Sequence, residues 1–117
     1  MKIEIYRCNV CGNIVNILNK GVGQLVCCGR PMELLKPNST EANPMTHKPI
    51  IGNNCVKVGH QPHPALPNHY IMWLAISNND ELVFKFIKPN QEINYPVKID
   101  SVDNVLAYCN IHSLWQK

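Results

Sequence analysis

Four cysteines within the first 28 residues constrain the fold of this chain more than any other feature. They form a Cys8-x-x-Cys11 turn and an adjacent pair, Cys27-Cys28. Gly12, directly after the first turn, allows a positive φ there, so that both sulfurs can face one ion. A segment of some 35 residues buries too little apolar surface to hold itself together by packing. We therefore expect a metal ion bound by these four thiolates to hold it together.

The spacing of these cysteines leaves the identity of the metal open. Thiolates select zinc or iron, so a purely structural zinc site remains an alternative. Neighbouring cysteines must strain to reach one ion, and we expect Cys27 and Cys28 to distort the tetrahedron. Disulfides are disfavoured because residues 1–6 lack the apolar run of a signal peptide, which predicts a cytoplasmic protein. Cys55 lies outside the set and is expected to be a buried or unreactive thiol.

Composition excludes several classes of protein. The longest apolar run, 70–76, is far shorter than the roughly 20 residues that span a bilayer, so no membrane association is expected. The formal net charge of +3 comes from scattered lysines and does not form the basic face that nucleic-acid binding requires. It modestly favours anionic partners or substrates.

The chain of 117 residues divides into two predicted domains. Residues 1–36 are expected to form a tiny β-unit around the first metal. Residues 36–46 are polar and proline-bearing, as in a linker, which places the boundary near Pro37. Residues 37–117 contain short runs rich in β-branched and aromatic residues and no sustained helical period. We predict an all-β protein whose second domain is an immunoglobulin-like antiparallel β-sandwich with strands at 55–58, 70–77, 82–88, 97–102 and 105–109.

A second group of metal-binding residue types lies in the predicted sandwich. Its members are four histidines and one cysteine: His47, His63, His69, Cys109 and His112. The flanking prolines of His63 stiffen its loop, and Cys109 and His112 offer a thiolate and an imidazole on one turn. A structural zinc site, a copper electron-transfer site and an open iron site compete for this set. Five ligands overfill the first two and favour iron with a free sixth position, although spacing alone leaves open that the histidines are unrelated.

Several motifs together resemble one known family, the two-iron superoxide reductases or desulfoferrodoxins. These motifs are YRCNVCGNIV at 6–15, LVCCG at 25–29, PHP at 62–64, HYI at 69–71, FIKP at 86–89, YPV at 95–97 and YCNIHSLW at 108–115. The resemblance implies a rubredoxin-like or desulforedoxin-like first domain with iron on Cys8, Cys11, Cys27 and Cys28. It further implies a second iron with the four histidines in a plane and Cys109 axial.

The same resemblance implies the activity and the partners. The expected reaction is one-electron reduction of superoxide to hydrogen peroxide at the second iron, without dioxygen production. A rubredoxin-like or similar electron donor and a homodimer are implied as well. Two alternatives remain: a rubredoxin-like electron carrier whose second metal is not catalytic, and a zinc-stapled β-sandwich binding module.

The chain departs from the family pattern at one place. Family members commonly carry Glu-Lys before the first histidine ligand, whereas this chain has Met45 and Thr46. Lys48 is our candidate for the positive charge that attracts superoxide. Glu41 is expected to be a solvated loop acid, and His60 a surface residue that is not a ligand.

Overall fold

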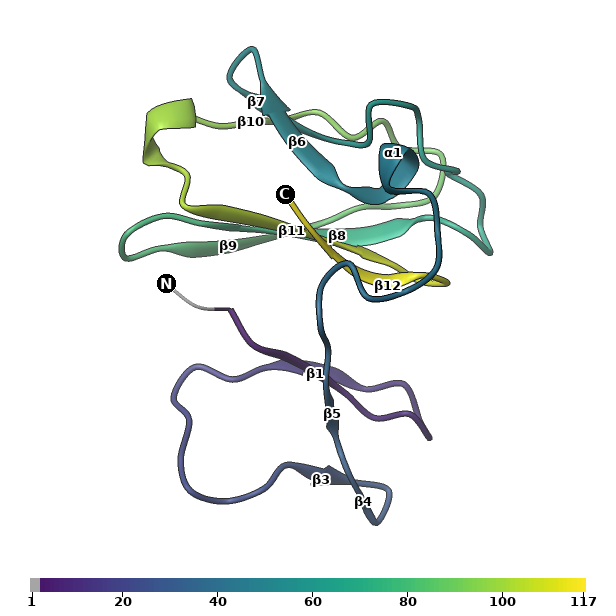
Figure 1. Ribbon diagram of the computed structural model, residues 1–117, viewed down its shortest axis with the longest axis vertical. Helices are drawn as coiled ribbons and strands as arrows, with labels where there is room; N and C mark the ends of the chain where they lie inside the picture. The colour runs from purple at the N-terminus through teal and green to yellow at the C-terminus, as the bar shows by residue number, and fades with distance from the viewer. Residues whose placement is uncertain (1–2) are drawn as a thin grey trace. The chain divides into compact units, whose positions relative to one another are not determined.

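The computed structural model describes residues 3–117, apart from the side chain of Ile99. Met1 and Lys2, the first residues of the predicted N-terminal domain, lie outside the described residues. The chain forms two compact units, one ending at Lys36 and one running over Pro37–Lys117. Figure 1 shows both as assemblies of strands joined by loops.

The N-terminal unit is a minimal β-structure. Its main sheet has the order β2-β1-β5, with β1 at Ile5–Arg7, β2 at Ile14–Asn16 and β5 at Glu33–Leu34. A second pair joins β3 (Val26–Cys27) to β4 (Arg30–Pro31). Among the described residues of this unit, the buried hydrophobic ones are Ile5, Cys8 and Leu35. Such a core is too small to stabilise the unit without another source of free energy.

The C-terminal unit is a sandwich of two antiparallel sheets, so the predicted all-β fold is confirmed. One sheet has the order β10-β7-β6, with β6 at Pro49–Gly52, β7 at Cys55–Val58 and β10 at Tyr95–Pro96. The other has the order β12-β11-β8-β9, with β8 at Ile71–Ser77, β9 at Leu82–Phe86, β11 at Asn104–Cys109 and β12 at Ser113–Gln116. The core cluster consists of Val56, Val58, Ile71, Leu74, Ile76, Ile87, Val105, Ala107 and Cys109. Alternation along β11 places Cys109 on the same face as Val105 and Ala107.

The prediction of a strand over 97–102 is wrong. A single turn of 3-10 helix, η1, occupies Ile99–Ser101, and the strand β10 precedes it at Tyr95–Pro96. The Ser101 N–H and hydroxyl both donate to the Lys98 carbonyl, at 3.0 and 2.8 Å. A side chain that closes its own turn in this way competes with strand pairing.

A short helix begins within the predicted linker. Helix α1 spans Pro44–His47, and the Asn43 side chain accepts a hydrogen bond from the Met45 N–H at 2.9 Å. Asparagine at the N-cap followed by proline at the first helical position is a strong helix start. Four residues are too few to show a helical period, which is why periodicity did not predict this helix.

Among residues 3–117, no helix is long and apolar enough to cross a membrane.

Candidate metal centres

The four cysteines of the N-terminal unit meet in one group. The sulfurs of Cys8, Cys11, Cys27 and Cys28 all lie within 4.8 Å of one another. Gly12 has φ +85°, and the Cys11 N–H points at the Cys8 sulfur at 3.4 Å, as the turn requires. Cys28 itself has φ +54°, a left-handed conformation that non-glycine residues rarely adopt. This strained backbone is what brings the adjacent cysteines to the same point.

The thiols of this group cannot all ionise without a cation among them. Backbone N–H groups of Cys11 and Val10 lower the pKa of Cys8 to about 6. The neighbouring Cys11 and Cys8 side chains raise the pKa of Cys27, and they raise the pKa of Cys28 to about 12. Each thiolate thus disfavours the ionisation of the next thiol. A bound metal ion removes this effect because it binds all four cysteines as thiolates.

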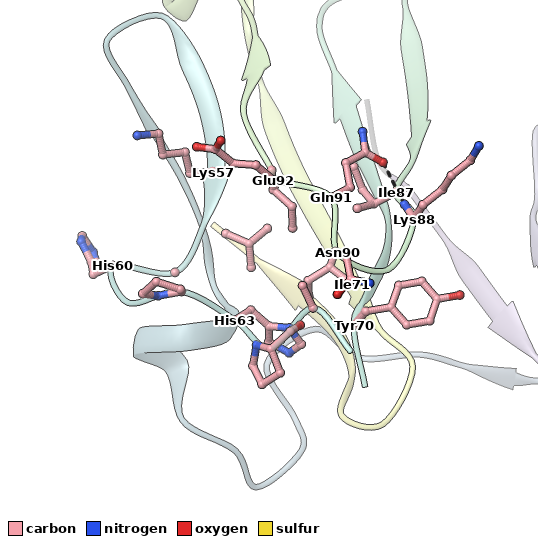
Figure 2. Close-up of a pocket in the computed structure, with 16 residues that line it drawn as sticks. Lys57, His60, His63, Tyr70, Ile71, Ile87, Lys88, Asn90, Gln91 and Glu92 are labelled. Atoms are coloured by element: carbon pink, nitrogen blue, oxygen red, sulfur yellow. Dashed lines mark hydrogen bonds between the residues drawn. The ribbon is translucent and has the colours of Figure 1, made fainter. Parts of the chain in front are cut away.

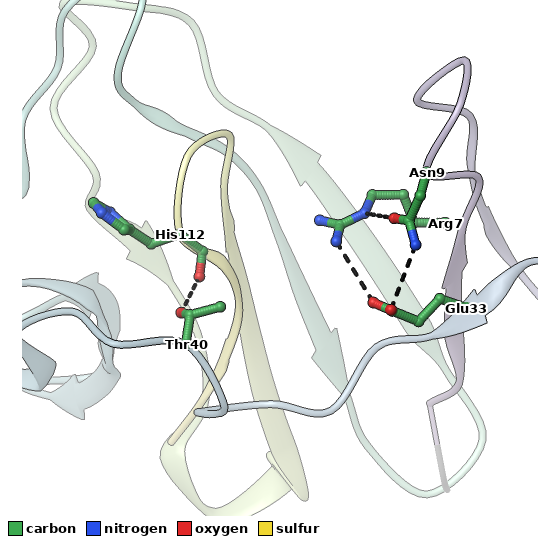
Figure 3. Close-up of polar contacts among 5 residues, drawn as sticks. All are labelled: Arg7, Asn9, Glu33, Thr40 and His112. Atoms are coloured by element: carbon green, nitrogen blue, oxygen red, sulfur yellow. Dashed lines mark hydrogen bonds and ion pairs between the residues drawn. The ribbon is translucent and has the colours of Figure 1, made fainter.

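Polar side chains support the turn between the first two cysteines. Asn9, inside the turn, donates from Nδ2 to Glu33 at 3.4 Å and accepts from Arg7 Nε at 3.1 Å. Arg7 and Glu33 also form an ion pair at 3.6 Å, which closes the network in Figure 3. The turn is thereby fastened to β5.

The second group of predicted ligands meets inside the C-terminal unit. The ligand atoms of His47, His63, His69 and Cys109 lie within 4.8 Å of one another. His112 joins them, because its Nδ1 lies 3.0 Å from Nε2 of His47 and 3.9 Å from Sγ of Cys109. His47 comes from α1, Cys109 from the end of β11, and the others from loops and turns. His47 and Cys109 are buried, with 3% and 0% of their surface exposed.

Backbone carbonyls fix which nitrogen of two rings carries the proton. His47 Nδ1 lies 2.9 Å from the Asn43 carbonyl, and His63 Nδ1 lies 2.7 Å from the Pro64 carbonyl. A carbonyl only accepts, so Nδ1 is the protonated nitrogen in both rings and Nε2 carries the lone pair. The two Nε2 atoms face each other at 3.1 Å. Two acceptors cannot hydrogen-bond, and a cation between them resolves the conflict.

Two further observations test whether a metal ion fits this group. His69 Nε2 is buried and has no hydrogen-bond partner, which is costly for a polar atom. A metal ion would satisfy it. Four imidazoles and one thiolate are donors that iron accepts, and they exceed the four ligands of a tetrahedral zinc site.

Burial sets the protonation of these ligands. It lowers the pKa of His63 to about 4, and lowers the pKa of His47 and of His69, with the neighbouring imidazoles adding to the effect. These three imidazoles are therefore neutral at pH 7, which is the form that binds metals. Burial raises the pKa of Cys109, and the backbone N–H groups of His112 and Ile111 oppose this rise.

The backbone at His112 is held by two side chains. Its carbonyl accepts from the Thr40 hydroxyl, as Figure 3 shows, and from the Trp115 indole N–H at 3.1 Å. The turn that carries Cys109 and His112 is thus anchored to the start of the unit and to β12.

The remaining candidates are not members of either group of ligands. Lys48 ends α1, where its N–H donates to the Pro44 carbonyl at 3.0 Å. His60 is exposed, at the margin of a cavity of about 500 Å³ that adjoins His63, and its ring points away from His63 in Figure 2. Glu41 is exposed. Cys55 is half-buried and donates to the Gly52 carbonyl at 3.2 Å, outside both groups.

The sequence reading missed two residues that support His47. The Asn43 carbonyl and the Thr46 hydroxyl both lie 2.9 Å from His47 Nδ1, and Thr46 Oγ1 donates to that carbonyl at 3.0 Å. The dipeptide Asn43-Pro44 is a helix-start signal that predicts α1. In such a helix the Asn43 carbonyl lies one turn before His47, and Thr46 directly precedes it.

Comparisons with known proteins cover nearly the whole chain. Residues 1–35 match the family model for the desulfoferrodoxin N-terminal domain, and residues 39–117 match the desulfoferrodoxin model. A desulfoferrodoxin homolog from Methanothermobacter thermautotrophicus is 47% identical over 96% of this chain and 95% of its own length. A desulfoferrodoxin from Desulfarculus baarsii is 39% identical over 98% of this chain and 95% of its own length. The crystal structure of a superoxide reductase from Treponema pallidum has a TM-score of 0.76 at 18% identity, covering 100% of this chain and 99% of that one.

Proposed function

Because the chain belongs to the desulfoferrodoxin family, we propose that it is a superoxide reductase with two iron ions. Its family makes it an iron-binding oxidoreductase, and the two ligand groups match two iron ions. The proposed ligands of the first are Cys8, Cys11, Cys27 and Cys28, and those of the second are His47, His63, His69, Cys109 and His112. We assign them to separate domains, 1–36 and 37–117.

One observation carries the proposal: five donor atoms converge on one place, and two of them, Nε2 of His47 and of His63, face each other without a proton between them. The lone pairs of His47 and His63 face each other, and His69 Nε2 has no partner. One thiolate and four imidazoles would hold an iron ion that can also bind a small anion. An electron-transfer protein needs no such anion binding.

The reaction converts one superoxide, one electron and two protons into one hydrogen peroxide. Iron in the second group would supply the electron. The side chains of the group hold the metal and keep its surroundings fixed. Cys109 supplies negative charge from the buried side, and the N–H groups of Ile111 and His112 limit how strongly its sulfur donates. We infer that the two protons are taken up from solvent.

The partners follow from the proposed reaction. An external one-electron donor, a rubredoxin-like or similar protein, must reduce the iron after each turnover. We propose a homodimer as well, since Leu18 and Val22 of the small N-terminal unit are almost fully exposed. Four cysteines that bind a metal must stay reduced, which suits a reducing compartment, so we propose a cytoplasmic location.

Metal and product analysis test this function together. We expect two iron ions per chain and one hydrogen peroxide for each superoxide consumed, with no dioxygen. A dismutase would give one peroxide for two superoxides. The Cys109→Ser variant should lose the activity, and Cys55→Ser, which changes a thiol outside both groups, should keep it. Zinc in the second group, or a spectrum of the second iron that azide does not change, would contradict an open catalytic site.

A further inference from the structure

We propose that Asn110 is a positioning residue for the second metal centre. Its side-chain amide fastens the loop that carries His69 to the turn that carries Cys109 and His112. The inference rests on the iron centre of the proposed function, and it does not depend on which substrate that centre reduces.

The amide of Asn110 bonds to the chain on both sides of His69. Its Oδ1 accepts from the Tyr70 N–H at 2.9 Å, and its Nδ2 donates to the Asn68 carbonyl at 3.0 Å. The Asn110 N–H also donates to the Tyr70 carbonyl, at 3.2 Å. Both ends of the side chain are therefore used, and both partners are immediate neighbours of one proposed ligand.

Regular pairing between β8 and β11 ends where the proposed ligands begin. Strands β8 and β11 pair regularly from Ser77 with Asn104 to Trp73 with Tyr108. The register then shifts, and Cys109 pairs with Ile71. Beyond that pair, one main-chain hydrogen bond still joins the two ligand-bearing segments, from the Asn110 N–H to the Tyr70 carbonyl at 3.2 Å. The side-chain amide of Asn110 adds two hydrogen bonds between the same segments.

The proposed ligand His69 has particular need of such a connection. The rings of His47 and His63 are each held by a hydrogen bond from Nδ1 to a carbonyl. The buried Nε2 of His69 has no hydrogen-bond partner, so its position depends on how its loop is held. The His69 backbone bonds to Leu66 of its own loop, at 2.9 and 3.1 Å. Those bonds shape the loop but do not tie it to β11. Asn110 therefore sets the position of His69 relative to the Cys109 sulfur.

Iron affinity of the second centre is the measurement that tests this role. Partners that orient metal ligands typically contribute about 10- to 100-fold to metal affinity, so Asn110→Ala should weaken iron binding by that factor. The absorption band from the Cys109 thiolate to iron should shift, because the thiolate and the His69 imidazole no longer hold their spacing. Asn110→Asp keeps the acceptor for Tyr70 and loses the donor to Asn68, and should have an intermediate affinity.

Asn38 provides a matched control. Its side chain makes the same two kinds of bond to Gln116, accepting from the backbone N–H at 2.9 Å and donating to the carbonyl at 3.3 Å. Gln116 ends β12 and flanks no proposed ligand. Asn38 also has φ +59°, so alanine there adds backbone strain. Asn38→Ala should lower the thermal midpoint while iron affinity and the absorption band stay unchanged.

Two results would overturn the proposal. One is an Asn110→Ala protein that binds iron as the unchanged protein does. The other is an equal loss of affinity in Asn38→Ala, which would make the effect one of general stability. If Asn110→Ala does not fold, the comparison of Asn110→Asp with Asn38→Ala decides between the same outcomes. Normal iron binding in the unchanged protein without superoxide reduction would refute the proposed function and leave the role of Asn110 standing.

Discussion

At the scale of single residues, main-chain carbonyls decide which ring nitrogen of His47 and of His63 carries the proton. Carbonyls at Asn43 and Pro64 take the Nδ1 protons of His47 and His63. The consequence is a pair of lone pairs aimed at one point before any metal arrives. Such preorganisation keeps the ligands in place without the entropy cost of gathering them.

The buried histidines predict a pH dependence of the iron-free protein. Burial lowers the pKa of His63 to about 4, whereas an unfolded histidine titrates near 6.5. Between these values the unfolded chain binds more protons than the folded one, so the free energy of unfolding falls as the pH falls from about 6.5 to about 4. His47 and His69 shift in the same direction and add to the slope.

Thermal unfolding of the iron-free protein across this range measures the effect. His63→Asn removes one of the titrating groups, so its thermal midpoint should depend less steeply on pH. A midpoint that stays constant from neutral pH to about pH 4 would show that the rings are solvated in the folded protein.

Lys48 gives a second prediction at this scale, for the rate of the proposed reaction. If Lys48 attracts superoxide, Lys48→Ala should lower the second-order rate constant by roughly two- to tenfold and weaken its salt dependence. Salt screens an exposed charge over about 10 Å at 0.1 M, so the rate constants of Lys48→Ala and of the unchanged protein should converge at high salt.

Lys98 is the control for this experiment. It precedes η1, at the opposite end of the sandwich from α1 in Figure 1, and Lys98→Ala should leave the rate constant unchanged. An unchanged rate and salt slope in Lys48→Ala would leave the charge of the metal itself as the attractor.

At the scale of elements, the ligands depend on a close contact between α1 and the loop that follows β7. The Gly59 N–H donates to the Lys48 carbonyl at 2.8 Å, and the Gln61 N–H donates to the Met45 carbonyl at 2.9 Å. These two bonds fix the loop of His63 against the helix of His47. The contact leaves no room for a side chain at position 59.

Gly59→Ala should therefore destabilise the protein. Gly59 has φ +78°, and a Cβ there would lie 2.5 Å from the Gln61 carbonyl oxygen and 2.7 Å from that of Met45. We expect the free energy of unfolding in urea to fall by about 1–3 kcal/mol, with weaker iron binding in the second group. Gly52→Ala, where no atom lies within 4 Å of the added Cβ, should change stability by less than about 0.5 kcal/mol. Equal stabilities of the two variants would contradict the contact.

The sequence predicted the longer strands, where a pattern repeats, and missed the four-residue strands β6 and β12 as well as two elements that a single turn decides. Strands β7, β8, β9 and β11 follow runs of β-branched and aromatic residues that were long enough to recognise. Turn η1 and helix α1 each depend on one local hydrogen bond, at Ser101 or Asn43, which periodicity does not register. The metal-binding residue types were evident, but the Asn110 connection links residues 40 positions apart and needed the structure.

At the scale of the whole molecule, the two units rely on different sources of stability. The C-terminal unit has a continuous core of nine buried residues, and the N-terminal unit has almost none. Thiolate binding of a metal commonly supplies the folding free energy of such small units. Loss of the first metal should therefore unfold the N-terminal unit and leave the sandwich folded.

Cys28→Ser tests this division of stability and of function. Serine is a poor ligand for a site of soft thiolates, so the visible bands of the four-thiolate iron should disappear and the iron content should fall from two to one per chain. The second group contains no residue of the N-terminal unit, so its iron, its spectrum and the rate of superoxide reduction should persist. Cys55→Ser, a cysteine outside both groups, should change neither spectrum. A Cys28→Ser protein that keeps its second iron but reduces superoxide much more slowly would show that the first iron takes part in turnover. The iron of the sandwich would then not be sufficient for the full rate.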